Sequence, residues 1–349
     1  MQCTLGDRVV GDGAPTFVIA EIGSNHDGSL ERALGLVDAA AAAGADAVKF
    51  QSFRAEGLLA RRWPAPGGGW THAEAYPVLE RLTVPPEWHA PLRDRARDRG
   101  VVFLSTPFDE SRAALLAALG MPAFKVASGD LTHVPLLRRL GGYHRPVLLS
   151  TGLASDDEIA AALAAVAAGA GNPDRCPPVV LLHCVSLYPL RPGDANLRVL
   201  PALRGRHGCL VGWSDHSPGH TLAVGAVALG ACVVEKHFTD DRHRAGPDHG
   251  FAMEPDEWRA MVDAIRTLET ALGDGEKQPR PDEAPERRWA RRSVYAARPL
   301  AAGTVLEPTD LKIVRPALGL PPSALDALVG RRLARAVETD QPLAAEDCA

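Results

Sequence analysis

The stretch LVGWSDH at Leu210–His216, followed after a helix-like segment by CVVEKH at Cys232–His237, decides the fold of this chain. Each stretch is a short apolar run that ends abruptly in polar, chemically capable residues. The segment Thr221–Gly230 between them is predicted to be a helix. A continuous apolar strand is what a parallel sheet covered on both faces requires. The two stretches therefore predict neighbouring buried strands whose polar ends lie together.

The same pattern recurs along the whole chain. Eight alternating strands and helices predict an α/β fold, a closed (β/α)8 TIM barrel, whose active site lies where the strands end. Other helices are expected at Leu30–Ala43, at Asp256–Leu272, and at Asp156–Ala168 after an N-cap at Ser155. The eight predicted strands are Phe17–Gly23, Asp46–Phe53, Val101–Pro107, Phe124–Ser128, Pro146–Gly152, Pro178–Ser186, Leu210–His216 and Cys232–His237.

The sequence predicts a barrel at residues 1–272, a linker at 273–290 and a small β-rich domain at 291–349. The linker is rich in Gly, Pro, Asp and Glu, as linkers are. The last domain carries short β-like runs at Ser293–Ala296, Leu311–Val314 and Leu333–Val337. Met1–Pro15 is predicted to form a hairpin. The insert Arg61–Pro86 is too rich in Gly and Pro for regular structure, and is interpreted either as a lid over the barrel mouth or as a plain loop.

Composition excludes several function classes. The net charge of −5 over 349 residues gives no electrostatic case for nucleic acid or an anionic membrane as partner. No apolar stretch approaches the roughly 20 residues needed to span a bilayer, and the polar start is not a signal peptide. The six cysteines form no C-x-x-C pair, which favours reduced thiols in a cytoplasmic protein.

Two histidines, His216 and His237, end consecutive predicted strands. Neutral imidazoles are common ligands for divalent metals, and adjacent strand ends can place two around one ion. The alternative is that one histidine caps a strand while the other bonds within the core. Two ligands do not close a site, so water and substrate would fill the other positions.

Two lysines, Lys49 and Lys125, lie inside predicted strands, where they are costly unless paired or functional. If they point into the mouth, they form an anion cradle together with nearby hydroxyl groups. If they do not, they extend outward or pair with Asp46 and Asp130. The hydroxyls are those of Thr106, Ser128 and Ser150.

Further polar residues are predicted around the same mouth. Glu21 lies mid-strand. It either binds a structural partner or acts as a general base or electrostatic stabiliser. Asn25 follows it, and Asp248 lies in a Gly-Pro-Asp-His turn that is either part of the rim or a simple turn. His183 and Cys184 are both expected to face the interior.

Nine motifs in order resemble the N-acetylneuraminate (sialic acid) synthase family. The tail, with Ser293, Gly303, Val314-Arg315-Pro316 and Gly330, looks like its antifreeze-like (SAF) domain. The resemblance covers essentially the whole chain. The motifs are AEIGSNHDG (20–28), ADAVKFQ (45–51), STPF (105–108), KVASGD (125–130), STG (150–152), HCVSLYP (183–189), SDH (214–216), EKHFT (235–239) and GPDH (246–249).

This resemblance implies condensation of phosphoenolpyruvate with the open-chain aldehyde of an N-acylated amino sugar, which gives a nine-carbon 2-keto acid and phosphate. The sugar would be N-acetylmannosamine or a related 2,4-diacetamido hexose. The resemblance also implies a divalent ion, Mn²⁺ before Co²⁺ or Mg²⁺, held by His216 and His237. It implies a domain-swapped homodimer in which Arg315 reaches the neighbouring barrel. The matching phosphoenolpyruvate contacts are Lys49, Thr106, Lys125, Ser128, Ser150, Ser186 and Ser214, and those at the sugar or rim are Asn25, Gln51, Asp130, Tyr188 and Asp248.

Two positions depart from the family pattern. Asp130 stands where many members have Glu, and Ser186 where some have Asn. Relatives also make legionaminate or pseudaminate. The alternative functions are another phosphoenolpyruvate aldol enzyme, a metal-dependent hydrolase, and a non-catalytic carbohydrate-binding barrel. Retention of both lysines and both histidines favours a synthase.

Overall fold

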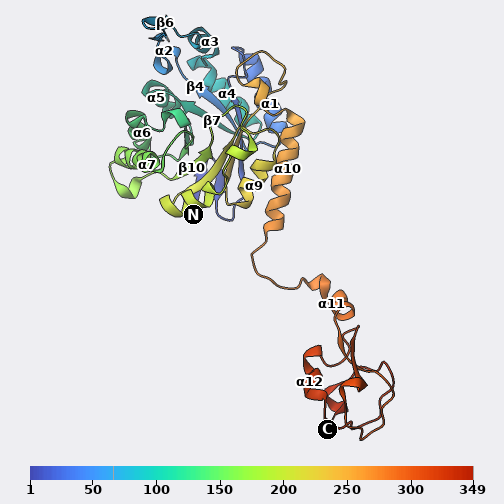
Figure 1. The fold of residues 1–349 in the computed structure, drawn as a ribbon. Helices are drawn as coiled ribbons and strands as arrows, with labels where there is room; N and C mark the ends of the chain where they lie inside the picture. The colour runs from blue at the N-terminus through green and yellow to red at the C-terminus, as the bar shows by residue number, and fades with distance from the viewer. Residues whose placement is uncertain (66, 349) are drawn as a thin grey trace. The chain divides into compact units, whose positions relative to one another are not determined.

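The computed structural model describes residues 1–65 and 67–348. It divides into two compact units, Met1–Gly273 and Asp274–Ala349. In the first, eight parallel strands pair in the order β7-β4-β3-β12-β11-β10-β9-β8, with β7 and β8 at the two ends of a nearly closed barrel (Figure 1). The prediction of a barrel is thus confirmed. The strands are β3 (Phe17–Gly23), β4 (Ala47–Ser52), β7 (Val102–Pro107), β8 (Phe124–Val126), β9 (Val147–Ser150), β10 (Val179–Cys184), β11 (Leu210–Asp215) and β12 (Val233–His237).

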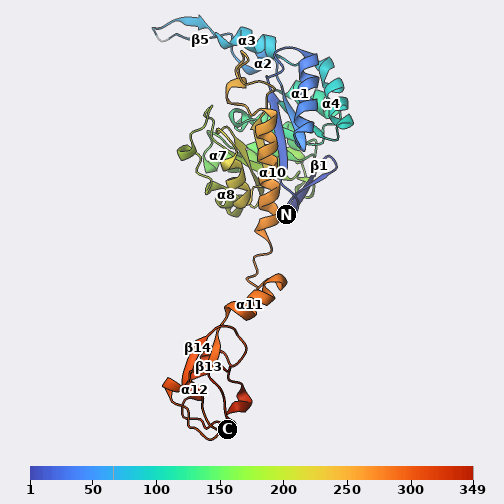
Figure 2. The same cartoon turned by 90° about the vertical axis from the view of Figure 1, so that its right-hand side faces the viewer.

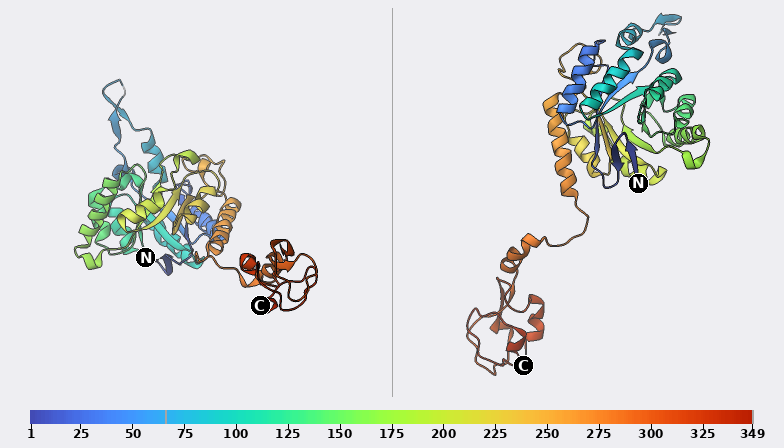
Figure 3. Two further views of the ribbon diagram at one scale, coloured as in Figure 1. Left: turned by 60° about the horizontal axis from the view of Figure 1, so that its bottom comes forward. Right: turned by 180° about the vertical axis from the view of Figure 1, so that it is seen from behind.

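Helices cover the outside of the barrel, as the view in Figure 3 also shows. Most follow the strands directly, and α7 begins at the predicted capping box, in which the Ser155 and Glu158 side chains exchange hydrogen bonds with backbone amides. The helices pack on the outer face of the strands, and side chains of the strands fill the barrel interior, which together buries a continuous core. The helices are α1 (Leu30–Ala42), α4 (His89–Asp98), α5 (Glu110–Ala118), α6 (Val134–Gly141), α7 (Asp156–Ala170), α8 (Val199–His207), α9 (Thr221–Ala228) and α10 (Pro255–Leu272).

Side chains alternate between the barrel interior and the helix-facing side at the ends of β11 and β12. Asp215 and Lys236 face outward, where they form a buried ion pair of 2.8 Å. Their neighbours on both strands therefore face inward, which directs His216 and His237 into the mouth.

The insert after β4 has regular structure, so the prediction of an irregular segment is wrong. α2 (Ala55–Leu58) leads to the hairpin of β5 (Arg62–Pro64) and β6 (Trp70–His72), and α3 (Ala75–Leu82) follows (Figure 2). Gly68 and Gly69 adopt positive φ angles of 90° and 80° in the hairpin connection, which only glycine does without strain. The glycines that argued against structure thus make the turn.

The predicted N-terminal hairpin is confirmed as β1 (Gln2–Leu5) paired with β2 (Arg8–Gly11). All six cysteines are free. No helix in residues 1–65 or 67–348 is long and apolar enough to cross a bilayer.

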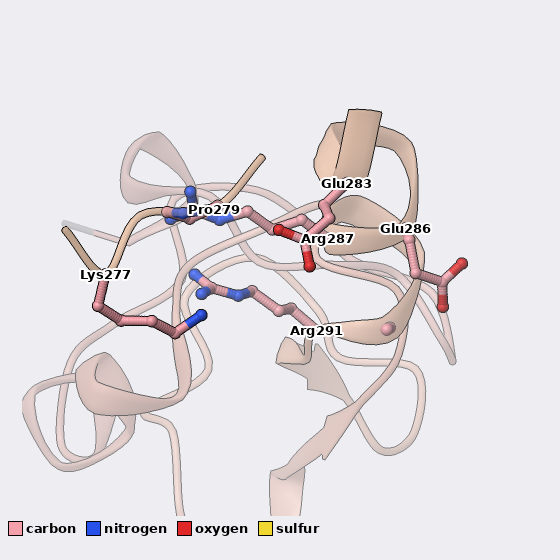
Figure 4. Close-up of a pocket in the computed structure, with 7 residues that line it drawn as sticks. Lys277, Pro279, Glu283, Glu286, Arg287 and Arg291 are labelled. Atoms are coloured by element: carbon pink, nitrogen blue, oxygen red, sulfur yellow. The ribbon is translucent and has the colours of Figure 1, made fainter. Parts of the chain in front are cut away.

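The second unit contains α11 (Ala284–Ala290), β13 (Ser293–Ala296) paired with β14 (Leu311–Val314), and α12 (Leu325–Leu328). The predicted linker thus carries a short helix. Leu333–Val337 is not a strand, because its residues make only isolated bridges to Leu300 and Cys348. Figure 4 shows a surface pocket of about 300 Å³ in this unit, around Lys277, Arg287 and Arg291. A small apolar cluster around Val294, Leu306 and Leu343 forms the core of the second unit.

Candidate active site

A buried charge cluster joins the ends of β3, β4 and β12. The Lys49 Nζ atom lies 2.5 Å from Glu21 Oε2 and 3.8 Å from Glu235 Oε2, and it donates a hydrogen bond to Thr106 Oγ1 at 3.2 Å. All four residues are at most 5% exposed. Burial alone would lower the pKa of Lys49, but the attraction of Glu21 and Glu235 outweighs it and raises that pKa. Lys49 is therefore a permanent cation inside the mouth.

The second lysine shares one of these carboxylates. The Lys125 Nζ atom lies 3.6 Å from Glu235 Oε1, to which the Ser214 hydroxyl donates at 3.1 Å. Burial lowers the pKa of Lys125. The attraction of Glu235 offsets the effect of burial only in part, and the positive charge of Lys49 lowers this pKa further. The lysines do not extend outward, and Asp46 pairs with Arg266 at 2.9 Å instead. Both lysines therefore lie inside the barrel mouth, and the binding of an anion by them stays a prediction.

Glu235 is the central residue that sequence reasoning left out of the site. Burial would raise its pKa, but Lys125 and Lys49 hold that pKa at about 2. The available signal was its spacing, since Glu235 lies two residues before His237 and so on the same face of β12. Its partners come from strands far away in the sequence.

Hydroxyl groups crowd the backbone after β9. The Gly152 amide donates to the Ser128 hydroxyl at 3.0 Å. A Cβ atom at Gly152 would lie 2.6 Å from Ser186 Oγ and 2.7 Å from Ser128 Oγ. The buried Ser150 hydroxyl has no hydrogen-bond partner among the described residues. Such a group of small donors suits an oxyanion.

The two predicted metal ligands lie side by side, with 5.5 Å between the ring centroids of His216 and His237. The His216 Nδ1 atom lies 3.1 Å from the Val185 carbonyl and donates to it, which leaves Nε2 with its lone pair. Burial and the neighbouring His237 lower the pKa of His216 to about 3, so its ring is neutral. The buried His237 Nδ1 has no hydrogen-bond partner in the described ranges and lies 4.0 Å from Asp248 Oδ2.

These side chains fit a divalent metal ion, because two imidazoles and a nearby carboxylate are typical ligands. Across residues 1–65 and 67–348, no three His, Cys, Asp or Glu residues form a cluster able to hold a metal alone. Water and substrate would therefore complete the coordination, as an open catalytic site requires.

The rim continues the site outward. The Tyr188 ring packs against His216 at a tilt of 45°, with 4.1 Å between ring centroids, and Gln51 Nε2 donates to Glu21 Oε1 at 2.8 Å. Asp248 Oδ2 accepts from the Ser24 hydroxyl at 2.8 Å. Tyr188, Gln51, Ser24 and Asp248 share a cavity of about 290 Å³ with one side of α3. The insert therefore forms a wall of the mouth.

Comparison with known proteins agrees with this geometry. The NeuB family model matches residues 36–277, and the SAF domain model matches residues 291–348. The chain belongs to the NeuB family. This membership confirms the resemblance seen in the sequence and the expectation of an enzyme of the transferase type.

Relatives of this NeuB-family chain match it over nearly its whole length. It is 39% identical to the N,N'-diacetyllegionaminic acid synthase of Legionella pneumophila, over 94% of this chain and 93% of that protein. It is 34% identical to the N-acetylneuraminate-9-phosphate synthase of Mus musculus, over 97% of this chain and 94% of that protein. The solved N-acetylneuraminic acid (sialic acid) synthetase of Leptospira borgpetersenii, in complex with citrate, matches with a TM-score of 0.73 and 34% identity, over 82% of this chain and 95% of that one.

Two predicted site residues of the barrel, Asn25 and Asp130, form no ion pair with the charge cluster among the described residues, and a third, Arg315, belongs to the second unit. Asn25 is wholly buried and donates through Nδ2 to the Phe238 carbonyl at 3.0 Å, which ties the β3 and β12 ends together. Asp130 is half-buried in the turn after β8, where burial raises its pKa to about 6. Arg315 is exposed in the second unit. Their contacts with substrate stay predictions.

The expectation that His183 faces the interior is wrong. Its Nε2 donates to the Ala195 carbonyl at 2.8 Å, and its ring packs on Trp213, whose side chain also faces the helices. Cys184, one residue later, does face inward and lies 3.9 Å from His216 Nδ1. Only one of two successive strand residues can face the interior.

Replacing Gly152 with alanine is expected to weaken phosphoenolpyruvate binding while the barrel stays folded. The new methyl group would displace the Ser128 and Ser186 hydroxyls, and such overpacking costs about 1–3 kcal/mol. We expect the KM for phosphoenolpyruvate to rise roughly tenfold, since 1.4 kcal/mol is a factor of ten. Steady-state phosphate release measures it.

Gly205→Ala in α8 is the matched control, because a Cβ there would meet open space in the part of the chain that the structure describes. An unchanged KM in Gly152→Ala, or an equal rise in both variants, would rule out an oxyanion cradle at Gly152.

Proposed function

We propose that this chain condenses phosphoenolpyruvate with the open-chain aldehyde of an N-acylated amino sugar and releases a nine-carbon 2-keto sugar acid and phosphate. The main support is the arrangement of Lys49 and Lys125 around Glu235, beside the imidazole pair His216 and His237. One chamber thus offers two buried cations for a trianionic substrate and nitrogen ligands for a metal ion. The names of the relatives, which are synthases of sugar acids, agree with this activity.

The anion would bind at the floor of the chamber. Lys125 supplies a charge without a full counterion, while the hydroxyls of Ser128, Ser150 and Ser186 supply directed hydrogen bonds to a phosphate. Lys49 would hold the other end of the substrate by pairing with the carboxylate of the substrate. Because both lysines are fixed by Glu235, the enol carbon would be presented in one orientation.

His216 and His237 would hold a divalent ion, which we propose is Mn²⁺, with Co²⁺ or Mg²⁺ as alternatives. When bound, such an ion supplies Lewis-acid polarisation of an aldehyde oxygen. The Tyr188 ring would help to hold the His216 imidazole in place by packing against it.

Glu21 would act where positive charge develops. The enol carbon C3 forms a bond to the aldehyde carbon, whose oxygen takes a proton, and C2 becomes cationic. Glu21 is held by Lys49 and Gln51, and its carboxyl group would stabilise that cation or accept a proton from the water that adds to C2. The tetrahedral adduct then loses phosphate by cleavage of the C2–O bond, which leaves the ketone.

Phosphate release measured with Mn²⁺ and a panel of N-acylated hexosamines tests this function. We expect release from phosphoenolpyruvate only when an acceptor is present. In water enriched with ¹⁸O the released phosphate should stay unlabelled, because its bridging oxygen comes from phosphoenolpyruvate. Labelled phosphate would contradict C–O cleavage, and no release with any acceptor would contradict the synthase.

We also propose that the chain works as a domain-swapped homodimer in the cytoplasm, with the second unit over the neighbouring barrel. The exposed Arg315, which follows β14, would then be free to approach the sugar in the partner's mouth.

A further inference from the structure

A buried ion pair joins β11 to β12 directly before the two imidazoles. In the parallel register of these strands Asp215 lies opposite Lys236. Each of the two is followed by one of the predicted metal ligands, His216 or His237. The Lys236 Nζ atom lies 2.8 Å from Asp215 Oδ2, and both side chains are at most 1% exposed. The pair therefore ties the two strands together at the step that precedes both imidazoles.

The same two side chains also hold the residue that follows His216. Asp215 Oδ1 accepts hydrogen bonds from the Ser217 backbone amide at 2.8 Å and from the Ser217 hydroxyl at 2.7 Å. Lys236 Nζ donates to the Ser217 carbonyl as well as pairing with Asp215. The His216 carbonyl itself accepts from the Leu190 amide at 2.8 Å. The backbone on both sides of His216 is thus fixed to Lys236 of β12.

Stability alone does not account for these charges. Asp215, Lys236 and Ser217 are each at most 2% exposed, and the ion pair lies on the face of the strands that is turned away from the mouth. A buried ion pair is costly to desolvate, and apolar residues of similar volume in its place often leave a protein equally or more stable. What such a pair does supply is a directed contact that forms at only one register of the two strands.

The separation of the imidazoles is the property that this contact can set. The rings of His216 and His237 lie 5.5 Å apart between centroids, and in residues 1–65 and 67–348 no group of three His, Cys, Asp or Glu could hold a metal. With two protein ligands, metal affinity depends strongly on their separation, because bond lengths at such sites vary by only about 0.2 Å. A slip of β11 against β12 would move one ring and not the other.

We propose that Asp215, Lys236 and Ser217 form a clamp for the metal ligands. The clamp sets the separation of His216 and His237 and so holds the two rings ready for a divalent ion. Its members are positioning residues, since they act on the ion only through the two histidines. The inference rests on the proposed function and adds to it three residues outside the mouth. Groups that orient metal ligands from behind are typically worth about 10–100-fold in metal affinity.

Calorimetry with Mn²⁺ on the full-length chain tests the clamp, together with urea unfolding of the same samples. Asp215→Asn leaves Lys236 buried without its counterion, so it should lose both stability and Mn²⁺ affinity. The double variant Asp215→Asn/Lys236→Met leaves no buried charge unpaired, so most of the lost stability should return. The clamp is still broken there, and we expect Mn²⁺ affinity to stay at least about tenfold below that of the wild type. A purely structural pair would regain both properties.

Asp46→Asn is the matched control. Asp46 also joins a backbone amide, that of Val18, to the cation of Arg266, but at the amino-terminal ends of the strands. It should keep the wild-type Mn²⁺ affinity. Ser217→Ala removes one bond of the clamp without leaving a charge unpaired, and it should also lower this affinity if neither Asp215 variant folds.

The outcomes separate the clamp from the metal site itself. Wild-type Mn²⁺ affinity in the double variant, or in Ser217→Ala where only that variant folds, overturns the clamp but leaves the metal site in place. An equal fall in Asp46→Asn also overturns the clamp, because the effect would then come from general destabilisation. A wild type that binds no Mn²⁺ overturns the proposed metal site and the clamp together.

Discussion

Glu235→Gln is expected to abolish most turnover and to destabilise the barrel. The substitution keeps the shape of the side chain but leaves Lys49 and Lys125 without the carboxylate that they share. Removing one partner from a buried charge cluster costs about 3–5 kcal/mol of stability. We expect kcat/KM to fall by a factor of about 10²–10³, the scale seen when one electrostatic stabiliser is removed. Urea unfolding and phosphate release measure the two effects.

The pH dependence of Glu235→Gln gives an independent readout. Burial already lowers the pKa of Lys125, and loss of Glu235 lowers it further because the main opposing attraction disappears. An anion needs the protonated lysine, so its binding is lost as pH rises through this lowered pKa. The alkaline fall in affinity for phosphoenolpyruvate should therefore begin at a lower pH in the variant.

Asp215→Asn is the matched control for Glu235→Gln. It breaks the outward ion pair with Lys236, which is equally buried but lies on the other face of the same strands. It should lose stability while its affinity for phosphoenolpyruvate stays near that of the wild type. If both variants lost that affinity equally, the effect would come from general destabilisation rather than from the lysine pair.

The sequence was sufficient to predict the barrel because each strand is an apolar run covered on both faces. β3 has the predicted bounds, and β11 ends one residue earlier than predicted. It was harder to predict which residues of a strand face the barrel interior and which face the helices. His183 and Cys184 are adjacent, and only the pairing of His183 with Trp213 on β11 decides which of them faces the helices.

Long-range partners explain what sequence reasoning missed. Glu235 matters because Lys49 and Lys125 approach it from β4 and β8, and no local pattern reveals those distances. The insert was expected to be irregular because Gly67–Gly69 suggested a loop, yet α3 is stabilised by the packing of Tyr76 on Ala55. Tertiary contacts, not local propensity, decide both features.

His237→Ala is expected to remove metal binding and turnover together while the fold stays intact. The imidazole lies beside His216 and Phe251, and its Nδ1 forms no hydrogen bond with any other described residue. The truncation therefore leaves no hydrogen-bonding group without its partner. We expect Mn²⁺ affinity to fall at least about a hundredfold, since even residues that only orient a ligand are worth 10–100-fold. Calorimetry with Mn²⁺ measures the affinity without any substrate.

His183→Ala is the control for His237→Ala. It also removes a buried imidazole from the barrel, but this imidazole faces the helices instead of the mouth. It should lose some thermal stability, since the Ala195 carbonyl loses its donor, but should still bind Mn²⁺. Ligand binding stabilises the native state, so added Mn²⁺ should raise the melting temperature of the wild type and of His183→Ala but not of His237→Ala. Equal Mn²⁺ affinity in wild type and His237→Ala would place the metal elsewhere, and the imidazole pair would then serve only to pack Tyr188 and Phe251 at the rim.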